Sequence, residues 1–216
     1  MSNFTIEPKT RNQKALMDSI IDNKMTIGVG PAGTGKTFVS VACGYSLFEE
    51  KSFELRQIVL IRPNISTGRS LGSFPGDSNE KLDSWMAPLT DNIQEVASNR
   101  LYRSMLQKKQ VVLQPLETIR GRSFEQALVI VDEAQNLQIN EIKAIVTRIG
   151  EDSKMIILGD PDQSDIPYSG LEWLVRLVDR HRISDVGTVR FTDRDIVRSG
   201  LVGAFVRAFA KEKDNR

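Results

Sequence analysis

The sequence has almost none of the side chains that build disulfide frameworks or metal clusters. Its 216 residues include one cysteine, Cys43, and one histidine, His181. A disulfide within the chain is therefore impossible, and a metal cluster of histidine and cysteine ligands is excluded. We expect Cys43 to be a small core residue, His181 to be exposed, and the protein to work in a reducing compartment, the cytoplasm.

Long hydrophobic runs and an excess of one charge are also missing. No apolar segment approaches the roughly 20 residues of a membrane-spanning helix, and none near the N-terminus resembles a secretion signal, so we expect a soluble protein. Lys plus Arg total 29 and Asp plus Glu total 28, so any basic binding surface must be local. The length suits a single domain over residues 1–216.

A glycine-rich stretch is the most informative feature of the chain. It matches the pattern G-x-x-x-x-G-K-[ST] at every position and consists of Gly30, Pro31, Ala32, Gly33, Thr34, Gly35, Lys36 and Thr37. Residues 25–29 predict a buried strand before it, and residues 38–49 predict a helix after it. The glycines let backbone N–H groups face a phosphate, and the helix N-terminus adds its positive end. The motif predicts nucleotide binding, with Lys36 on the β- and γ-phosphates and the Thr37 hydroxyl on Mg²⁺.

A second apolar strand ends in two adjacent carboxylates. Residues 127–131 are apolar throughout, as expected of a central parallel strand, and Asp132 and Glu133 follow at once. After a phosphate loop, this pattern indicates the second half of an ATPase site. Asp132 would hold the magnesium shell through water, and Glu133 would polarise the attacking water. A solvated turn is the alternative, and the upstream phosphate loop disfavours it.

Two glutamines are further candidates. Gln163 closes the loop 159–163 after a predicted strand over 154–158, where it could contact the γ-phosphate or the attacking water. The same loop composition also suits an ordinary β-turn. Gln13 belongs to an amphipathic helix predicted over 11–21. Its amide offers a donor and an acceptor, which suits the edge of adenine, but a helix-surface glutamine is an equally good interpretation.

The remaining pattern predicts alternating strands and helices. Strands are expected at 57–61, 111–114 and 187–191, and helices at 137–149, 170–180 and 195–209, with Gly150 as a C-cap. Residues 79–109 read as a helical insertion between sheet strands, with a break near Pro88. Residues 1–10 and 211–216 are expected to be loose.

Several basic residues are candidates for contacts with phosphate or nucleic acid. Arg100, Arg103, Lys108 and Lys109 gather near Tyr102, although a solvated helix face explains them better. Arg120 and Arg122 flank a glycine in a loop and suit phosphate recognition, and the sequence does not choose among nucleotide, nucleic acid and a neighbouring subunit. The basic loops around Arg62, Arg69 and Arg120 motivate a contact with single-stranded nucleic acid.

With these motifs in hand, the chain resembles the PhoH family, phosphate-starvation-type P-loop ATPases of bacteria and phages. The resemblance runs from about Gln13 to Val202. It depends on GPAGTGKT at 30–37, RP at 62–63, FPGD at 74–77, RGR at 120–122, DEAQN at 132–136, TRIG at 147–150, GD at 159–160 and DIVR at 195–198. It implies an α/β three-layer fold similar to the first RecA-like domain of superfamily 1 helicases. The sheet would be mainly parallel, with one strand between the phosphate-loop strand and the strand ending at Asp132. Arg69 and Ser199 depart from the family pattern, and we assign no role to either.

The resemblance also implies ATP hydrolysis and a tendency to form rings, and helicase activity is suggested for the family. The length resembles a single-domain member of the phage type, which would act in the cytoplasm of a bacterial host. An arginine should stabilise the transition state, and Arg198 ranks first because it lies in the DIVR phrase. The other candidates are Arg194, Arg122 and Arg148. Because one chain supplies one such domain, we expect a homo-oligomer, such as a hexameric ring, in which a neighbour donates the arginine.

Different outputs fit this site. One is a motor on single-stranded RNA or DNA, and the other is a nucleotide-driven switch or assembly protein that touches no nucleic acid. A small P-loop kinase is a weaker alternative, because Glu133 and Gln163 suit the handling of water. No Asn-Lys-x-Asp phrase for reading guanine is present, which disfavours a GTPase.

Overall fold

The computed structural model describes residues 6–63, 78–119, 121, 123–198 and 200–213. Its strands are β1 (Met25–Val29), β2 (Gln57–Ile61), β3 (Val111–Leu113), β4 (Ala127–Val131), β5 (Lys154–Gly159) and β6 (Val186–Arg190). Its α-helices are α1 (Arg11–Asp22), α2 (Lys36–Glu49), α3 (Ser78–Ala97), α4 (Asn99–Gln107), α5 (Ile139–Val146), α6 (Gly170–His181) and α7 (Gly200–Lys213). Short 3-10 turns are η1 (Lys51–Phe53), η3 (Leu116–Thr118), η4 (Ala134–Asn136), η5 (Pro161–Gln163) and η6 (Asp193–Asp195).

All six strands form one parallel sheet in the order β3-β2-β4-β5-β1-β6. β5 separates β1 from β4, as predicted. Val29 of β1 aligns with Gly159 of β5, and Val131 of β4 aligns with Ile157 of β5. Because parallel strands end at the same edge of a sheet, the phosphate loop, Asp132 and the loop after β5 emerge side by side.

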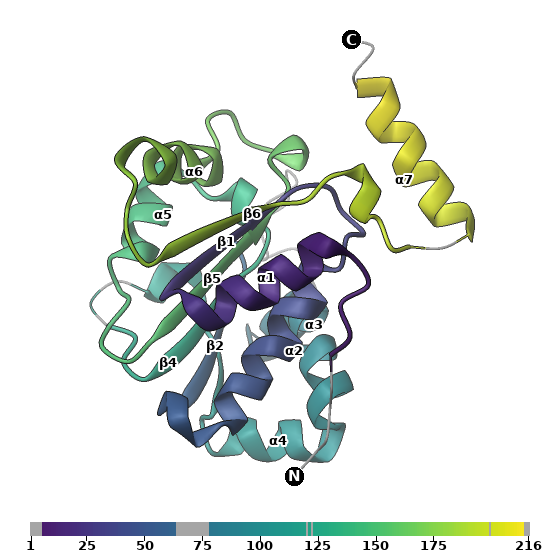
Figure 1. Cartoon of the computed structure of the whole chain (residues 1–216). Coiled ribbons are helices and arrows are strands. Elements are labelled where there is room, and N and C mark those ends of the chain that lie inside the picture. Colours follow the sequence, from purple (N-terminus) through teal and green to yellow (C-terminus); the bar gives the residue numbers. More distant parts are fainter. Residues whose placement is uncertain (1–5, 64–77, 120, 122, 199, 214–216) are drawn as a thin grey trace.

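Helices cover both faces of the sheet, which confirms the three-layer α/β prediction (Figure 1). α1, α2, α3 and α4 enclose one apolar core, and α5 and α6 enclose the other. β4 contributes to both cores, because Leu128 and Ile130 face the first and Val129 and Val131 face the second. A strand apolar on both faces is what a central parallel strand requires. α7 stands apart from this body (Figure 1).

Two predictions from the scarce residue types are confirmed. Cys43 is buried in the first core, and His181 is exposed at the end of α6. Among the described residues, no group of three or more His, Cys, Asp or Glu side chains is arranged to hold a metal ion. The helices of this part of the chain are also too short or too polar to cross a bilayer.

The helical insertion continues through Pro88, so the break predicted there is wrong. Pro88 lies inside α3, whose inner face buries Met86 and Ile93 completely. Burial of this face outweighs the one backbone hydrogen bond that proline removes. The interruption falls instead at Ser98, which has a φ of 63° between α3 and α4.

The helix predicted over 137–149 is shorter than expected. α5 ends at Val146, and Ile149 forms a parallel bridge with Phe124. The Gly150 N–H donates to the Phe124 carbonyl over 2.8 Å, so Gly150 belongs to this bridge and is not a helix C-cap. Long-range backbone pairing therefore replaces the last turn of the predicted helix.

The C-terminal helix begins at Gly200 and not at Asp195. Asp195 ends η6 and accepts hydrogen bonds from the Thr192 N–H (2.9 Å) and from Asn12 Nδ2 (2.7 Å) on α1. The Val197 N–H then donates to the Gly33 carbonyl over 3.0 Å. These bonds hold the chain against the phosphate loop where a helix was predicted.

Candidate active site

The phosphate loop joins β1 to α2 and depends on glycine for its backbone. Gly30 has a φ of 137° and Gly35 a φ of 80°, both in the region that favours glycine. A Cβ at Gly30 would lie 2.4 Å from the Phe191 carbonyl oxygen, and one at Gly35 would lie 2.7 Å from Gln13 Nε2. Neither position has room for a side chain. Pro31, Ala32, Gly33 and Thr34 complete the loop as predicted.

Lys36 and Thr37 begin α2 and face the same cavity. The Lys36 ammonium donates to the carbonyls of Gly30 and Pro31, each over 2.7 Å. Burial lowers the pKa of Lys36, against the opposing influence of the Asp160, Asp132 and Glu133 carboxylates. The site therefore contains one buried cation and three carboxylates within electrostatic reach of it.

Gln13 supports the loop from behind. Its side chain is 3% exposed, its Nε2 donates to the Thr34 carbonyl over 2.9 Å, and its Oε1 accepts from the Lys9 N–H over 2.7 Å. Both ends of the amide therefore bind within the chain. Contact with adenine stays a prediction, while its contact with the loop is part of the fold.

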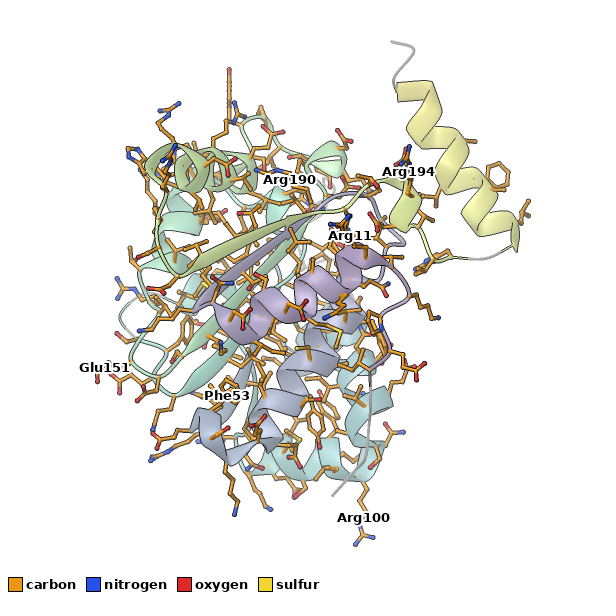
Figure 2. All side chains as sticks on the ribbon, in the orientation of Figure 1. Arg11, Phe53, Arg100, Glu151, Arg190 and Arg194 are labelled. Carbon is orange, nitrogen blue, oxygen red and sulfur yellow. The ribbon has the colours of Figure 1, made fainter. Side chains whose placement is uncertain are left out.

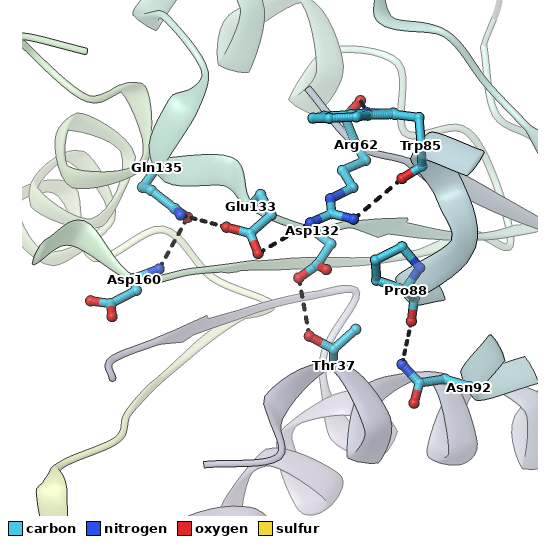
Figure 3. A network of polar contacts seen from close by, with 9 residues as sticks. All are labelled: Thr37, Arg62, Trp85, Pro88, Asn92, Asp132, Glu133, Gln135 and Asp160. Carbon is cyan, nitrogen blue, oxygen red and sulfur yellow. Dashed lines mark hydrogen bonds and ion pairs between the residues drawn. The ribbon is translucent and has the colours of Figure 1, made fainter. Parts of the chain in front are cut away.

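Asp132 lies at the end of β4 beside Thr37. The Thr37 hydroxyl donates to Asp132 Oδ1 over 3.1 Å (Figure 3). Burial, and secondarily the neighbouring Glu133 charge, raises the pKa of Asp132 to about 6, against the lowering effects of Arg62 and of the Thr37 hydrogen bond. A hydroxyl and a carboxylate are hard oxygen donors of the kind that Mg²⁺ prefers when phosphates and water complete its shell. The two side chains thus fit the predicted magnesium ion.

Glu133 is held on both carboxylate oxygens. Gln135 Nε2 donates to Glu133 Oε2 over 2.6 Å, and the Arg62 guanidinium lies 3.5 Å from Oε1 (Figure 3). Its backbone is left-handed, with a φ of 54°, which turns the chain sharply out of β4 into η4. A non-glycine residue in this region is uncommon and is found at functional sites. The predicted catalytic carboxylate is therefore fixed by residues from two other positions in the chain.

Asp160 links this carboxylate to the phosphate loop. Its Oδ2 accepts from the Ala32 N–H over 3.2 Å and from Gln163 Nε2 over 2.7 Å. Its own N–H donates to Gln135 Oε1 over 3.1 Å. A continuous set of contacts therefore runs from Glu133 through Gln135 and Asp160 to the loop and to Gln163.

One cavity of about 340 Å³ brings most of the predicted site together. It is lined by Ala32, Gly33, Gly35, Lys36, Thr37, Phe38, Asn92, Asp132, Glu133, Gly159, Asp160, Gln163, Val197 and Arg198. This volume lies within the usual range of ligand sites, roughly 300 to 1,000 Å³.

Arg198 lies in the cavity of its own chain. The Val197 bond to Gly33 brings it there, and a Cβ added at Gly33 would lie 3.3 Å from Arg198 Cγ. This differs from the expectation that a neighbour supplies Arg198. Arg194 is exposed on η6 (Figure 2), and Arg148 follows α5 outside the cavity. Arg122 lies outside the described residues.

The basic residues of α4 form a separate exposed surface. Arg100 and Arg103 are exposed, and Figure 2 shows Arg100 projecting away from the body. Lys108 and Lys109 are exposed too, whereas Tyr102 is buried, which favours the predicted solvated face. Arg69, Arg120 and Ser199 lie outside the described residues.

Sequence analysis did not predict the roles of Arg62, Gln135 and Asp160. Arg62 directly follows β2, which pairs with β4, so the ends of the two strands meet; the Asp132 N–H donates to the Ile61 carbonyl over 3.0 Å. The signal that could have located Arg62 was its place after a strand that neighbours the Asp-Glu strand. No local pattern identifies Gln135, because it follows β4 whereas its partner Asp160 follows another strand, β5.

A family model described as PhoH-like protein matches residues 5–210. The chain belongs to the PhoH family. It is 35% identical over 213 residues to the PhoH-like protein of Mycobacterium tuberculosis, covering 97% of this chain and 59% of the relative. The PhoH-like protein of Bacillus subtilis is 34% identical over 211 residues, covering 96% of this chain and 65% of that protein. This PhoH-family chain thus spans about three fifths of the length of the curated relatives it matches.

Solved structures of phage proteins share the fold of the PhoH-family chain. The HK97 bacteriophage large terminase has a TM-score of 0.61 at 16% identity, covering 98% of this chain and 50% of the terminase. The UvsW helicase from bacteriophage T4 has a TM-score of 0.54 at 15% identity, covering 88% and 62%. The large terminase of a thermophilic bacteriophage, in complex with ADP, has a TM-score of 0.50 at 12% identity, covering 90% and 48%. The fold is that of P-loop NTPases, as predicted.

Proposed function

We propose that this chain is a Mg²⁺-dependent ATPase whose turnover depends on single-stranded nucleic acid and on assembly with further copies of itself. The observation that carries the proposal is the single cavity in which Lys36, Thr37, Asp132 and Glu133 meet. Phosphate-binding, metal-binding and water-polarising groups are together at one edge of the sheet. The ADP complex of the thermophilic-phage terminase, which has the same fold, supports a nucleotide as the ligand.

In this proposal, the residues divide the work of hydrolysis. The loop N–H groups and Lys36 bind the β- and γ-phosphates. Glu133 orients a water molecule and takes its proton as the water oxygen attacks the γ-phosphorus. The bond between the γ-phosphorus and the bridging oxygen breaks, and the products are ADP and inorganic phosphate. Thr37 and Asp132 would hold Mg²⁺, which when bound neutralises charge on the phosphates. Gln163 lies at the edge of the cavity, from which it would sense the γ-phosphate.

Arg198 would stabilise the transition state from within its own chain. Its place beside Gly33 supports this assignment. A homo-oligomer remains part of the proposal, and a hexameric ring is the form suggested by the family resemblance. If a neighbour contributes an arginine, it is a different one, such as Arg194 or Arg148.

The nucleic-acid part of the proposal has less direct support. Arg62, one of its motivations, contacts Glu133 and Trp85. The T4 UvsW protein is a helicase, and the shared fold makes a strand-dependent ATPase a reasonable model for this chain. A switch or assembly ATPase that touches no nucleic acid is the alternative, favoured by a net charge of +1.

ATP turnover by the full chain tests the proposal. Turnover is measured across a protein concentration series, with and without single-stranded RNA and DNA, and with EDTA as the test for Mg²⁺. Lys36→Ala should abolish turnover, whereas the matched Lys143→Ala should leave it unchanged, because Lys143 is exposed on α5 outside the cavity.

Each outcome selects one form of the proposal. Turnover that rises cooperatively with protein and is stimulated by a strand supports the oligomeric motor. Turnover indifferent to strands supports the switch. If the protein is a monomer and its specific activity does not change with protein concentration, the oligomer is removed from the proposal. Wild-type turnover no higher than that of Lys36→Ala overturns the ATPase assignment.

A further inference from the structure

The catalytic carboxylate proposed above has an arginine beside it that the ATPase motifs do not require. Arg62 Nη2 lies 3.5 Å from Glu133 Oε1, and the two side chains are 16% and 35% exposed. Gln135 occupies the other oxygen of Glu133 over 2.6 Å. Both carboxylate oxygens of Glu133 therefore have partners from the chain.

Arg62 is itself held by Trp85 of α3. Arg62 Nη1 donates to the Trp85 carbonyl over 3.2 Å, and the guanidinium lies 5.2 Å from the centroid of the indole ring. Trp85 Nε1 donates in return to the Arg62 carbonyl over 3.4 Å. Figure 3 shows the arginine between the tryptophan and Glu133. Arg62 Nε is buried and has no hydrogen-bond partner among the described residues, so its position depends on these contacts.

The same helix reaches the nucleotide cavity. Asn92, two turns beyond Trp85 on α3, lines the cavity together with Thr37 and Glu133. Pro88 lies between them and cannot supply the backbone N–H that would bond to residue 84. α3 is therefore weakened by one hydrogen bond between its contact with Arg62 and its contact with the cavity.

We propose that Arg62 is a positioning residue that restrains Glu133, and that Trp85 makes the restraint depend on the position of α3. This inference rests on the proposed ATPase function. A guanidinium beside a carboxylate stabilises the negative charge of the carboxylate. The carboxylate is then a weaker acceptor for the proton of a water molecule. Moving Trp85 away from Arg62 frees Glu133 to polarise water. The helical insertion thereby controls the rate of hydrolysis and leaves phosphate binding to the loop.

Steady-state kinetics of tryptophan variants tests this coupling. Trp85→Leu removes the ring and its N–H, and is expected to raise basal kcat about fivefold with KM within about twofold, as loss of one cation–π contact would give. Trp85→Phe keeps a ring over the guanidinium and should give a smaller rise. Trp173→Leu is the matched control, because Trp173 on α6 also packs under a cation, Lys143 at 5.1 Å, outside the cavity.

Fluorescence supplies a readout that does not depend on turnover. Trp85 and Trp173 are the two tryptophans of the chain, so Trp173→Phe leaves Trp85 as the reporter. Mg²⁺-ADP and a non-hydrolysable Mg²⁺-ATP analogue should give different Trp85 emission if α3 responds to the γ-phosphate. If Trp85→Leu does not fold, as judged by circular dichroism, the Trp85 emission with the two nucleotides decides whether the inference stands.

The two levels of failure are distinguishable. Wild-type turnover equal to that of Lys36→Ala overturns the ATPase proposal and this inference with it. Active wild type combined with a kcat for Trp85→Leu that is unchanged or lower overturns the inference alone. Identical Trp85 emission with the two nucleotides overturns it as well.

Discussion

The two halves of the candidate site differ in the chemical groups that form them. The phosphate-binding half consists mainly of backbone: loop N–H groups between β1 and α2, positioned by glycines that no other residue can replace without strain. The hydrolytic half consists of side chains, in which Glu133 is held by Arg62 and Gln135. A backbone-built site is fixed by the fold, whereas a side-chain site can be adjusted by the movement of one rotamer or one helix.

Asp132 and Glu133 show this difference at two adjacent positions. Asp132 is 6% exposed and faces Thr37 of the loop, so it belongs with the phosphate-binding half. Glu133 has a positive φ and is held by Arg62 from the end of β2 and by Gln135 from its own turn. We infer that binding is the constant property of this site and that the rate of hydrolysis is the adjustable one.

The largest expected effect separates the two halves. Glu133→Gln should lower ATP turnover by about 100- to 1,000-fold, because an amide cannot accept the water proton. Nucleotide affinity should stay within about twofold, since the loop is untouched. Turnover and the binding of a fluorescent ATP analogue are measured on the same preparation. The exposed Glu151→Gln is the control (Figure 2). A parallel loss of affinity would show that the halves are not separable.

A second substitution tests the electrostatic cost of Asp132. Its raised pKa, about 6 against an ordinary 3.8, means that ionising it opposes folding; this effect is absent below pH 4 and complete above pH 6. Asp132→Asn should therefore stabilise the ligand-free chain by about 3 kcal/mol at pH 7.5 and by much less at pH 4. Urea unfolding at the two pH values measures this. Equal effects at both values would contradict the burial argument.

Asp160 should be the position where the comparison breaks down, because it contacts both halves. Asp160→Ala removes the carboxylate, so the bonds that its Oδ2 accepts from Ala32 and Gln163 are both lost. Turnover and nucleotide affinity should fall together, each by about tenfold. Asp165→Ala, at an exposed position after η5, is the matched control. An effect confined to turnover would assign Asp160 to the hydrolytic half alone.

The smallest effect concerns the rigidity of the backbone-built half. Cys43 lies on α2, and burial raises the pKa of its thiol to about 11, so at pH 8 only about a thousandth is thiolate. Labelling by a thiol reagent should be slow and should slow further, by a few-fold, when Mg²⁺-ADP binds the start of the same helix. Mass spectrometry follows the rate. Fast labelling at the unfolded rate would show that α2 opens locally.

The predictability of the site follows the same division. The loop residues, Thr37 and Asp132 could be placed from sequence, because their spacing and the strand before each motif determine their geometry. The fold class and the position of β5 between β1 and β4 followed from the family resemblance. In each case, the information lies within a few residues of the chain or in a topology shared by many proteins.

The contacts that connect the hydrolytic half to the rest of the site could not be predicted, because they join residues from different strand ends. The Arg62–Glu133 pair and the Gln135–Asp160 bond depend on strand order and on side-chain directions that no local pattern contains. The boundaries of α5 and α7 failed for the same reason, since the partners of Ile149 and Val197 are distant in sequence.

The strand order has a consequence for synthesis of the protein. β1 leaves the ribosome early, yet Met25 pairs with Met155 on one side and with Val186 on the other. The strand that carries the phosphate loop therefore has no neighbour until β5 has been synthesised, and such non-local pairing is slow to form. A nascent chain cannot form the nucleotide site before that point. Until then β1 is an apolar segment with no strand to pair with. Nucleotide cannot shield it from aggregation at this stage, whereas a chaperone can.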